Sequence, residues 1–366
     1  MGSFQFMKNN ILIFVLALFF LACPKENEPI FPDGSEHYKI LSMTDVRGMA
    51  RDISVADSIV CVAAGEGGLQ IFDISNPEAP RWIGENLEGD FAEIEQVEYS
   101  ASSNVVYEII EESGGNDWGR AVLFSDTLRN DTLHTSLEDD FSLNFQNIEM
   151  KIWDQPVHSE LSDTEFLLFT LRSSGAFRIY RHEKSGADSW NRTGETFDFQ
   201  SDGIFTGFAM DGNICAVSRS QMGFILFDFS TFDIVNLVGA TKICEFDNLQ
   251  GEAEQIAIRD NLVAVALDEY DGGEDGIALV DITNPELPQL RKIYFVKGRV
   301  NRMVFDDEKL FIAAGTGGLV VLDVSDPAVP LYFDGLDFDY VAAVQIYDAK
   351  IWIADRIRGL IILKER

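Results

Sequence analysis

The stretch GLQIFDISNPEAP, from Gly68 to Pro80, returns twice farther along the chain. The later copies are GIALVDITNPELP, from Gly276 to Pro288, and GLVVLDVSDPAVP, from Gly318 to Pro330. Each copy joins a short apolar run to an Asp and then to a turn-forming Asn/Asp-Pro step, which predicts a buried strand ending in a tight turn. A supersecondary unit repeated in this way indicates a repeat architecture.

Each full copy follows two further apolar runs and precedes another, so one unit reads as four short strands. The first apolar residue of each unit recurs about every 41 to 60 residues, a spacing that suits one propeller blade. These residues are Ile53, Val97, Ile148, Phe208, Ile256, Met303 and Val344. A single blade cannot bury both of its faces, so stacking in a ring supplies the core. The sequence therefore predicts an all-β fold, a seven-bladed β-propeller of four-stranded antiparallel blades.

The two ends of the repeat region are incomplete in complementary ways. The last copy stops after GLIIL, from Gly359 to Leu363, while the segment Tyr38–Met43 precedes the first full unit without a blade of its own. Adding this segment to the last blade removes an exposed sheet edge, so we expect the last blade to be closed by the N-terminal strand. The alternative is six blades with an irregular insertion at 100–196.

These units resemble the LVIVD repeat, named for the strand sequence that stands here at Leu69–Asp73 and Ile277–Asp281. The resemblance covers 46–90 and 197–366, whereas 91–196 matches only in rhythm. It implies a β-propeller of a kind found mostly on secreted or surface bacterial proteins of unassigned activity.

The N-terminus has the features of a targeting signal. Lys8 precedes the uncharged run Ile11–Ala22, which is too short to span a bilayer and fits the apolar region of a secretory signal. The following Phe20–Cys23 resembles a lipobox, in which cleavage before Cys23 exposes a thiol for lipidation. We therefore expect a signal peptide at 1–22, a lipid-anchored linker at 23–35 and the propeller at 36–366. The alternative is a plain secretory signal with an incidental cysteine.

This targeting signal predicts a bacterial lipoprotein of the cell envelope that is attached to the outer membrane through Cys23. It does not predict whether the protein faces the periplasm or the cell surface. The chain has 61 Asp and Glu against 28 Lys and Arg, a net charge of −33, which argues against nucleic-acid binding. The other cysteines, Cys61, Cys215 and Cys244, are odd in number and two lie in apolar runs, so no disulfide framework is expected.

Few motifs point to chemistry. The four histidines have no spacing typical of a metal or proton-transfer site, and no catalytic motif is present, so no catalytic residue is predicted. The repeated Asp73, Asp228, Asp281 and Asp323 precede turns, and their carboxylates should accept hydrogen bonds from turn backbone. A Ca²⁺ site is one interpretation of the acidic stretch 268–275, although it lacks the alternation of the common calcium loop and a solvated hairpin explains it more simply. Its ligands would be Asp268, Asp271, Glu274 and Asp275.

One face of the propeller should carry the functional surface. The connections into the first strands and the hairpins between second and third strands share this top face, and unlike polar residues gather on them. The ligand-binding candidates are Arg51, Glu95, Trp118, Arg219, Glu254, Asn301, Arg302, Asp355 and Arg356. Arg51 is the foremost of these, because a cation in so acidic a chain can hold an anionic or carbonyl-bearing ligand. Trp118 is expected on a flexible hairpin between 112 and 120.

These observations favour a binding or interaction module with a protein or carbohydrate partner at the top face and no cofactor. The competing class is an envelope enzyme with a site at the channel mouth, similar to Ca²⁺-dependent lactonase or hydrolase propellers. Fold alone does not separate the two classes, since propellers host both. The sequence does not predict the oligomeric state.

Overall fold

The computed structural model describes residues 35–366 except for short gaps. The gaps are 87–91, 102–104, 113–116, 130–131, 142–146, 154–164, 173–175, 187–188, 201–202, 234–235, 237 and 271–273. Within 112–148, 153–176 and 180–202, only backbone is described. The residues from Phe31 onward form one compact unit.

The described strands form seven antiparallel sheets of four strands each. Sheets 1 to 3 contain β2 (Asp52–Ala56), β3 (Ile59–Ala63), β4 (Leu69–Asp73) and β5 (Arg81–Asn86); β6 (Ala92–Ser100), β7 (Val105–Glu112), β8 (Asp117–Arg129) and β9 (Thr132–Phe141); and β10 (Asn147–Trp153), β11 (Glu165–Arg172), β12 (Ala176–Gly186) and β13 (Ser189–Gln200). Sheets 4 and 5 contain β14 (Gly207–Asp211), β15 (Ile214–Ser218), β16 (Phe224–Asp228) and β17 (Thr241–Phe246); and β18 (Glu252–Arg259), β19 (Leu262–Tyr270), β20 (Glu274–Asp281) and β21 (Gln289–Val296). Sheets 6 and 7 contain β22 (Arg302–Asp306), β23 (Lys309–Ala313), β24 (Leu319–Asp323) and β25 (Leu331–Leu336); and β26 (Val341–Tyr347), β27 (Lys350–Asp355), β28 (Gly359–Glu365) and β1 (Tyr38–Thr44).

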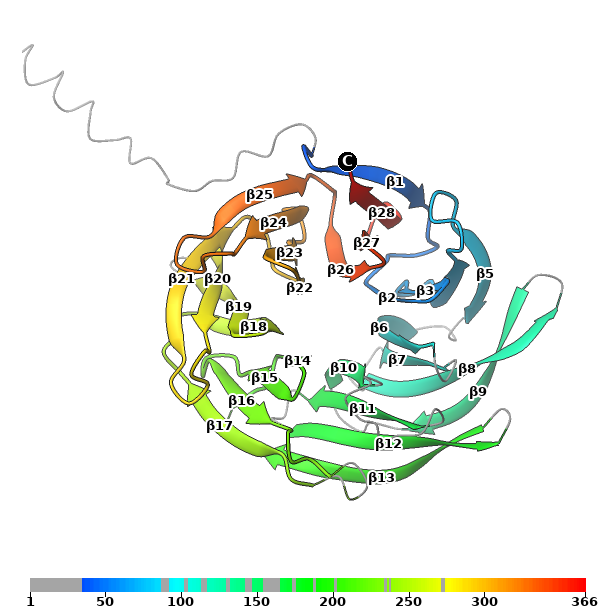
Figure 1. Ribbon diagram of the computed structural model, residues 1–366. Coiled ribbons are helices and arrows are strands. Elements are labelled where there is room, and N and C mark those ends of the chain that lie inside the picture. The colour runs from blue at the N-terminus through cyan, green and yellow to red at the C-terminus, as the bar shows by residue number, and fades with distance from the viewer. Residues whose placement is uncertain are drawn as a thin grey trace, which may run out of the picture. The chain divides into compact units, whose positions relative to one another are not determined.

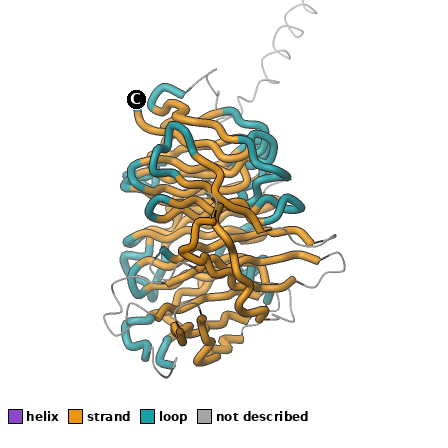
Figure 2. Tube along the Cα trace, turned by 90° about the vertical axis from the view of Figure 1, so that its right-hand side faces the viewer, coloured by secondary structure: helices purple, strands orange, loops and turns teal. Residues whose placement is uncertain are grey.

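The first strands of the sheets lie innermost and contact one another in cyclic order (Figure 1). These strands are β2, β6, β10, β14, β18, β22 and β26, and β26 contacts β2 again. Loops gather on the two faces of this arrangement, seen edge-on in Figure 2. We call the face with the connections into the first strands the top face, and the opposite face, where first strands turn into second strands, the bottom face.

The N-terminal strand joins the last sheet. β1 pairs antiparallel with β28, from Tyr38 opposite Glu365 to Thr44 opposite Leu360, with one bulge between Ile40 and Ser42. Strand β28 would otherwise be an edge with unpaired N–H and C=O groups, which this pairing removes.

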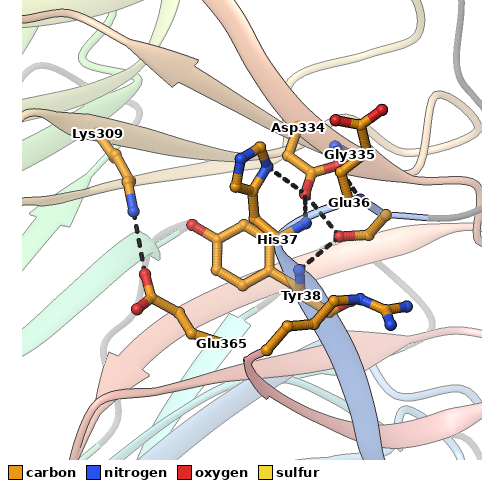
Figure 3. Close-up of polar contacts among 9 residues, drawn as sticks. Glu36, His37, Tyr38, Lys309, Asp334, Gly335 and Glu365 are labelled. Atoms are coloured by element: carbon orange, nitrogen blue, oxygen red, sulfur yellow. Dashed lines mark hydrogen bonds and ion pairs between the residues drawn. The ribbon is translucent and has the colours of Figure 1, made fainter.

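The residues just before β1 reach across to sheet 6, where they surround the carboxylate of Asp334 (Figure 3). The Ser35 hydroxyl donates to Asp334 Oδ2 at 2.6 Å and the His37 backbone N–H donates to the same oxygen at 2.7 Å. The His37 ring stacks on Phe333, with centroids 4.3 Å apart. Residues 35–38 therefore tie β25 of sheet 6 to the strand that completes sheet 7.

Apolar runs of the repeat are buried between neighbouring sheets. In β4 the residues from Leu69 to Phe72 are all buried, as a strand covered on both faces requires. One cluster joins sheets 5 and 6 through Leu279, Val296, Leu310 and Val320. Cys61 and Cys215 belong to such clusters, and burial raises the pKa of both thiols. Among the described residues Cys61, Cys215 and Cys244 are free thiols.

The turns of the repeat follow the predicted design. The carboxylates of Asp73, Asp228, Asp281 and Asp323 each accept a hydrogen bond from the backbone N–H two residues later, which confirms their structural role. These bonds lower the pKa of Asp281 to about 2, together with the nearby Arg291. At the opposite hairpins, Gly68 and Gly318 have φ of 75° and 77°, which explains the glycine at this position of the repeat.

Candidate functional site: the central channel and the top face

Three polar side chains of sheets 1 to 3 link the first strands around the channel. Asp52 accepts a hydrogen bond from Val97 N at 3.2 Å, Gln96 from Met150 N at 3.0 Å, and Glu149 from Phe208 N at 2.8 Å. Each residue thus bonds the backbone of the next sheet. The residues whose backbone N–H groups donate these bonds, Val97, Met150 and Phe208, hold equivalent positions in their first strands. The first apolar residue of the unit in sheet 3 is therefore Met150, two residues after the predicted position near Ile148.

Arg302 of β22 lies across the channel from these residues. Its guanidinium contacts Asp52 Oδ1 at 3.2 Å and Glu149 Oε1 at 3.1 Å, so one cation joins sheets 6, 1 and 3. Burial raises the pKa of both carboxyls, and Arg302 opposes that rise. Arg302, Asp52 and Glu149 thus form a connected set of ion pairs across the channel, called the brace below.

A cavity of about 630 Å³ extends from this brace along the first strands to Asp211 and Gly212 at the bottom face. Its charged lining beyond the brace consists of Glu98, Lys151 and Asp211, and its apolar lining includes Met210, Met303 and Val304. Glu98 follows Val97 and Lys151 follows Met150, so they hold equivalent positions in neighbouring sheets. Within the described part of the chain, neither side chain has a direct hydrogen bond or ion pair.

Glu98 is poised to change its charge near neutral pH. Its pKa is raised to about 7, chiefly by burial; Asp52 and Glu149 add to the rise, while Lys151 and Arg302 oppose it. A carboxyl with such a pKa can accept or release a proton at physiological pH. The cavity therefore combines one titratable acid, one ammonium group and an apolar wall.

On the top face, the guanidinium of Arg51 is occupied by its own chain. It forms ion pairs with Glu93 and Glu95, and its side chain is 16% exposed. Burial would lower the pKa of Arg51, but Glu95 and Glu93 raise it overall. Glu111 adds a third carboxyl, whose pKa is raised by burial and by Glu95. Glu95 and Glu93 thus occupy Nη1 and Nη2 of Arg51, while its Nε is buried without a hydrogen-bond partner.

The other top-face candidates mostly hold loops in place. Arg219 is buried and lies 3.2 Å from the Glu245 carboxylate, while Glu254 binds Arg299 at 2.8 Å. Asp355 accepts bonds from the backbone of Tyr340, Ile357 and Arg358. The remaining two contacts are Asn301 Nδ2 donating to Val341 O at 2.9 Å and the Arg356 guanidinium 4.2 Å from the Tyr340 ring centroid. Of the candidates whose side chains are described, Arg302 is the one that lines the channel cavity.

Trp118 differs from the expectation in its backbone. It belongs to β8 and pairs with Ile110, so its placement on a flexible hairpin is wrong, and its side chain lies outside the described residues.

The acidic stretch is described only in part. Asp275 lies next to Asp268, and burial together with this neighbouring carboxyl raises the pKa of Asp275 to about 6. Asp271 and the Glu274 side chain lie outside the described residues. In the part that is described, no group of three His, Cys, Asp or Glu side chains could hold a metal ion, and no helix could cross a bilayer.

The comparisons with known proteins agree with this geometry. The family model of the LVIVD repeat matches residues 47–86 and 308–333, that is sheet 1 with the connection before it and much of sheet 6. The chain carries LVIVD repeats. Repeats of this family form β-propellers, so the similarity inferred from the strand sequences is confirmed, on narrower ranges than 46–90 and 197–366. No curated protein matches the sequence.

Solved structures similar to this chain have low sequence identity to it, and one of them is a β-propeller domain. The WD40 β-propeller domain of Doa1 has 11% identity and a TM-score of 0.56, covering 90% of this chain and 97% of that one. Saccharomyces cerevisiae Sqt1 has 12% identity and a TM-score of 0.56, covering 92% and 100%. Chaetomium thermophilum Raptor has 14% identity and a TM-score of 0.58, covering 90% of this chain and 29% of that one. These similarities support the fold alone.

Sequence reasoning missed Asp52, Glu98, Glu149 and Lys151. The sequence contains a pattern that indicates them, because each of these charged residues is adjacent to the apolar residue of a first strand, as Asp52 is to Ile53. Side chains alternate along a strand, so such neighbours share the face opposite to the apolar residue.

Proposed function

We propose that this LVIVD-repeat protein is a lipid-anchored binding module of the bacterial envelope that holds a protein partner on its top face. In this proposal the seven sheets are the blades of a closed propeller, and β1 completes the last one. The pairing of β1 with β28 and the cyclic contacts of the first strands support this closure.

The observation that carries the proposal is a set of exposed apolar side chains on the top loops. They are Met49, Ile204, Met222 and Ile357. Ile357 is 73% exposed at the tip of the hairpin between β27 and β28, beside the stacked Arg356 and Tyr340. Exposed Met and Ile next to Arg and Tyr are typical of the centre of protein interfaces. The charged groups around them are paired within the chain, which lowers the desolvation cost of covering this face.

A lipid anchor at Cys23 would leave the top face free for a partner. Cys23 lies outside the described residues, and a linker from there to Ser35 spans at most about 40 Å when fully extended. The chain enters β1 at Tyr38, opposite Glu365 near the bottom face. A lipid at Cys23 would therefore hold the bottom face toward the membrane and leave the top face open to a partner.

A paired-variant capture experiment tests the top face. The mature domain is immobilised, envelope extract is passed over it, and the proteins retained are quantified for wild type, Ile357→Ser and Leu287→Ser. Leu287 is 68% exposed on a bottom-face turn of sheet 5 and serves as the matched control. We expect a protein whose retention falls at least tenfold with Ile357→Ser and is unchanged with Leu287→Ser. Equal retention by all three, loss with Leu287→Ser alone, or retention of glycans instead of protein would contradict the proposal.

A further inference from the structure

The channel cavity contains two opposite charges that attract each other without forming a direct hydrogen bond or ion pair. Glu98 of β6 and Lys151 of β10 both line the cavity, and neither makes a direct hydrogen bond or ion pair with any described residue. The other polar groups of the same layer are in use, since Ser54 accepts a bond from Tyr99 N at 2.9 Å and Gln345 from Val55 N at 2.8 Å. Charged groups in a partly desolvated site are costly without a partner, so this pair calls for complementary groups.

The remaining charges of the cavity restrict what such a ligand can be. Arg302 already has two carboxylates, Asp52 and Glu149, as partners, so its charge is balanced within the protein. A purely anionic ligand would meet Lys151 but also the carboxylates of Glu98 and Asp211, and a purely cationic ligand would meet Lys151 without a counterpart. A ligand with one carboxylate and one ammonium group satisfies both unpaired side chains.

The opposite wall is apolar. Met210, Met303, Val304 and Val344 line the cavity from sheets 4, 6 and 7. Met210 and Val304 are partly exposed, whereas Met303 and Val344 are mostly buried in the cores between sheets. Pockets that bind small molecules combine such apolar walls with a few convergent polar groups, and about 630 Å³ lies within their usual range of volumes.

We propose that the channel cavity binds a small zwitterion of the amino-acid or dipeptide class, with its carboxylate on Lys151, its ammonium group on Glu98 and an apolar side chain against Met210 and Val304. This site opens toward the bottom face and is separate from the top-face surface, so its test does not depend on the proposed partner.

Binding should depend on pH through Glu98. The groups that face this carboxyl are Lys151 and Glu149 of β10, Asp52 of β2 and Arg302 of β22. Burial raises the pKa of Glu98 to about 7, and only its ionised form attracts an ammonium group strongly. The ionised fraction of Glu98 rises about tenfold between pH 6 and pH 8, while a dipeptide's α-amino group, with a pKa of about 7.7–8.0, loses about half of its protons by pH 8. Affinity for the zwitterion should therefore rise about fourfold over this range.

The experiment uses L-leucyl-L-leucine as the probe, together with its N-acetylated and C-amidated forms, in calorimetric titrations of the mature domain. We expect the unblocked dipeptide to bind at least tenfold more tightly than either blocked form. Lys151→Met should remove the preference over the amidated form only, and Glu98→Gln should remove the preference over the acetylated form and the pH dependence. Lys39→Met, on the exposed face of β1, is the matched control and should change nothing.

Three results would overturn the inference. The first is no binding of the unblocked dipeptide up to about 10 mM at pH 8, where even weak ligands are detected. The second is equal binding of blocked and unblocked forms. The third is binding that Lys151→Met and Glu98→Gln leave unchanged while both variants keep the wild-type melting temperature. If a variant does not fold, the pH series on the wild-type protein still decides, because a flat profile from pH 6 to pH 8 contradicts the role of Glu98.

Discussion

Replacing Asp334 by Ala should release the N-terminal segment from sheet 6 and destabilise the ring. The Asp334 side chain is buried and accepts bonds from Ser35 Oγ at 2.6 Å, His37 N at 2.7 Å and, more weakly, Glu36 N at 3.4 Å (Figure 3). A hydrogen bond to a charged group contributes about 1.5–3 kcal/mol, and neighbouring bonds are not additive. The two short bonds together therefore suggest a loss of about 3–5 kcal/mol in the free energy of unfolding.

Calorimetry converts this loss into a melting temperature. The unfolding entropy of a domain of this length is about 0.7 kcal/mol/K, so the melting temperature should fall by about 4–7 °C if the ring unfolds as one unit. The control is Asp326→Ala in the exposed turn of the same sheet, where the carboxylate accepts a local bond from Ala328 N at 3.0 Å. We expect a shift of about 1 °C or less for this control.

The pH dependence has a definite sign. Burial alone would raise the pKa of Asp334, but the bonds from Ser35 and His37 outweigh it and lower the pKa. A carboxyl whose folded pKa lies below its unfolded value stabilises the fold above the unfolded pKa and loses that effect as pH falls through the folded pKa. The difference between wild type and Asp334→Ala should thus be constant from about pH 5 to 8 and shrink below about pH 4. A melting temperature no lower than that of Asp326→Ala would refute the reasoning.

Two further predictions concern the anchor and the channel brace. Cys23→Ser should abolish lipid labelling and move the protein out of the membrane fraction, and a variant that still sediments with membranes in high salt would exclude the lipoprotein assignment. Arg302→Met should leave Asp52 and Glu149 as buried carboxylates without a cation, at a cost of about 3–5 kcal/mol at pH 7. Because burial already raises the pKa of both carboxyls, the loss should be smaller at pH 5, and urea unfolding at the two pH values checks this. An equal loss at both values would contradict the brace.

The repeat made the fold predictable because its turn chemistry is explicit. The Asp before each Ser/Thr-Asn/Asp-Pro step bonds the turn backbone, so strand ends could be located to the residue in β4, β20 and β24. Between 91 and 196 the sequence contains no Ser/Thr-Asn/Asp-Pro step. The strands there are longer, as in β8 from Asp117 to Arg129. Length and apolar rhythm then locate a repeat position only to within a turn, which is why Ile148 was chosen in place of Met150.

The charged residues of the channel other than Arg302 were not predicted because side chains alternate between the two faces of a strand. The candidates were taken two residues before the apolar residue of each first strand, at positions such as Arg51 and Glu254. Side chains two apart in a strand share a face, so a position next to the apolar residue was the better choice. Arg302, directly before Met303, entered the candidate set as a neighbour of Asn301 and is the member that lies in the channel. Its partners Asp52 and Glu149 come from other sheets, and no local pattern in the sequence shows that pairing.

The charge composition supports the proposal that a ligand binds Lys151 in the channel. With 61 acids against 28 bases, each cation in this chain has about two carboxylates available to it. Described cations at partly buried positions use them: Arg51 takes Glu93 and Glu95, and Arg302 takes Asp52 and Glu149. Lys151 is half-buried in the same channel and forms no ion pair with a described residue, although Glu98 lines the same cavity. Lys151 attracts Asp52, Glu98 and Glu149 and opposes the rise of their pKa, yet it makes no direct bond to any of them. In the proposal, the ligand carboxylate supplies that direct partner.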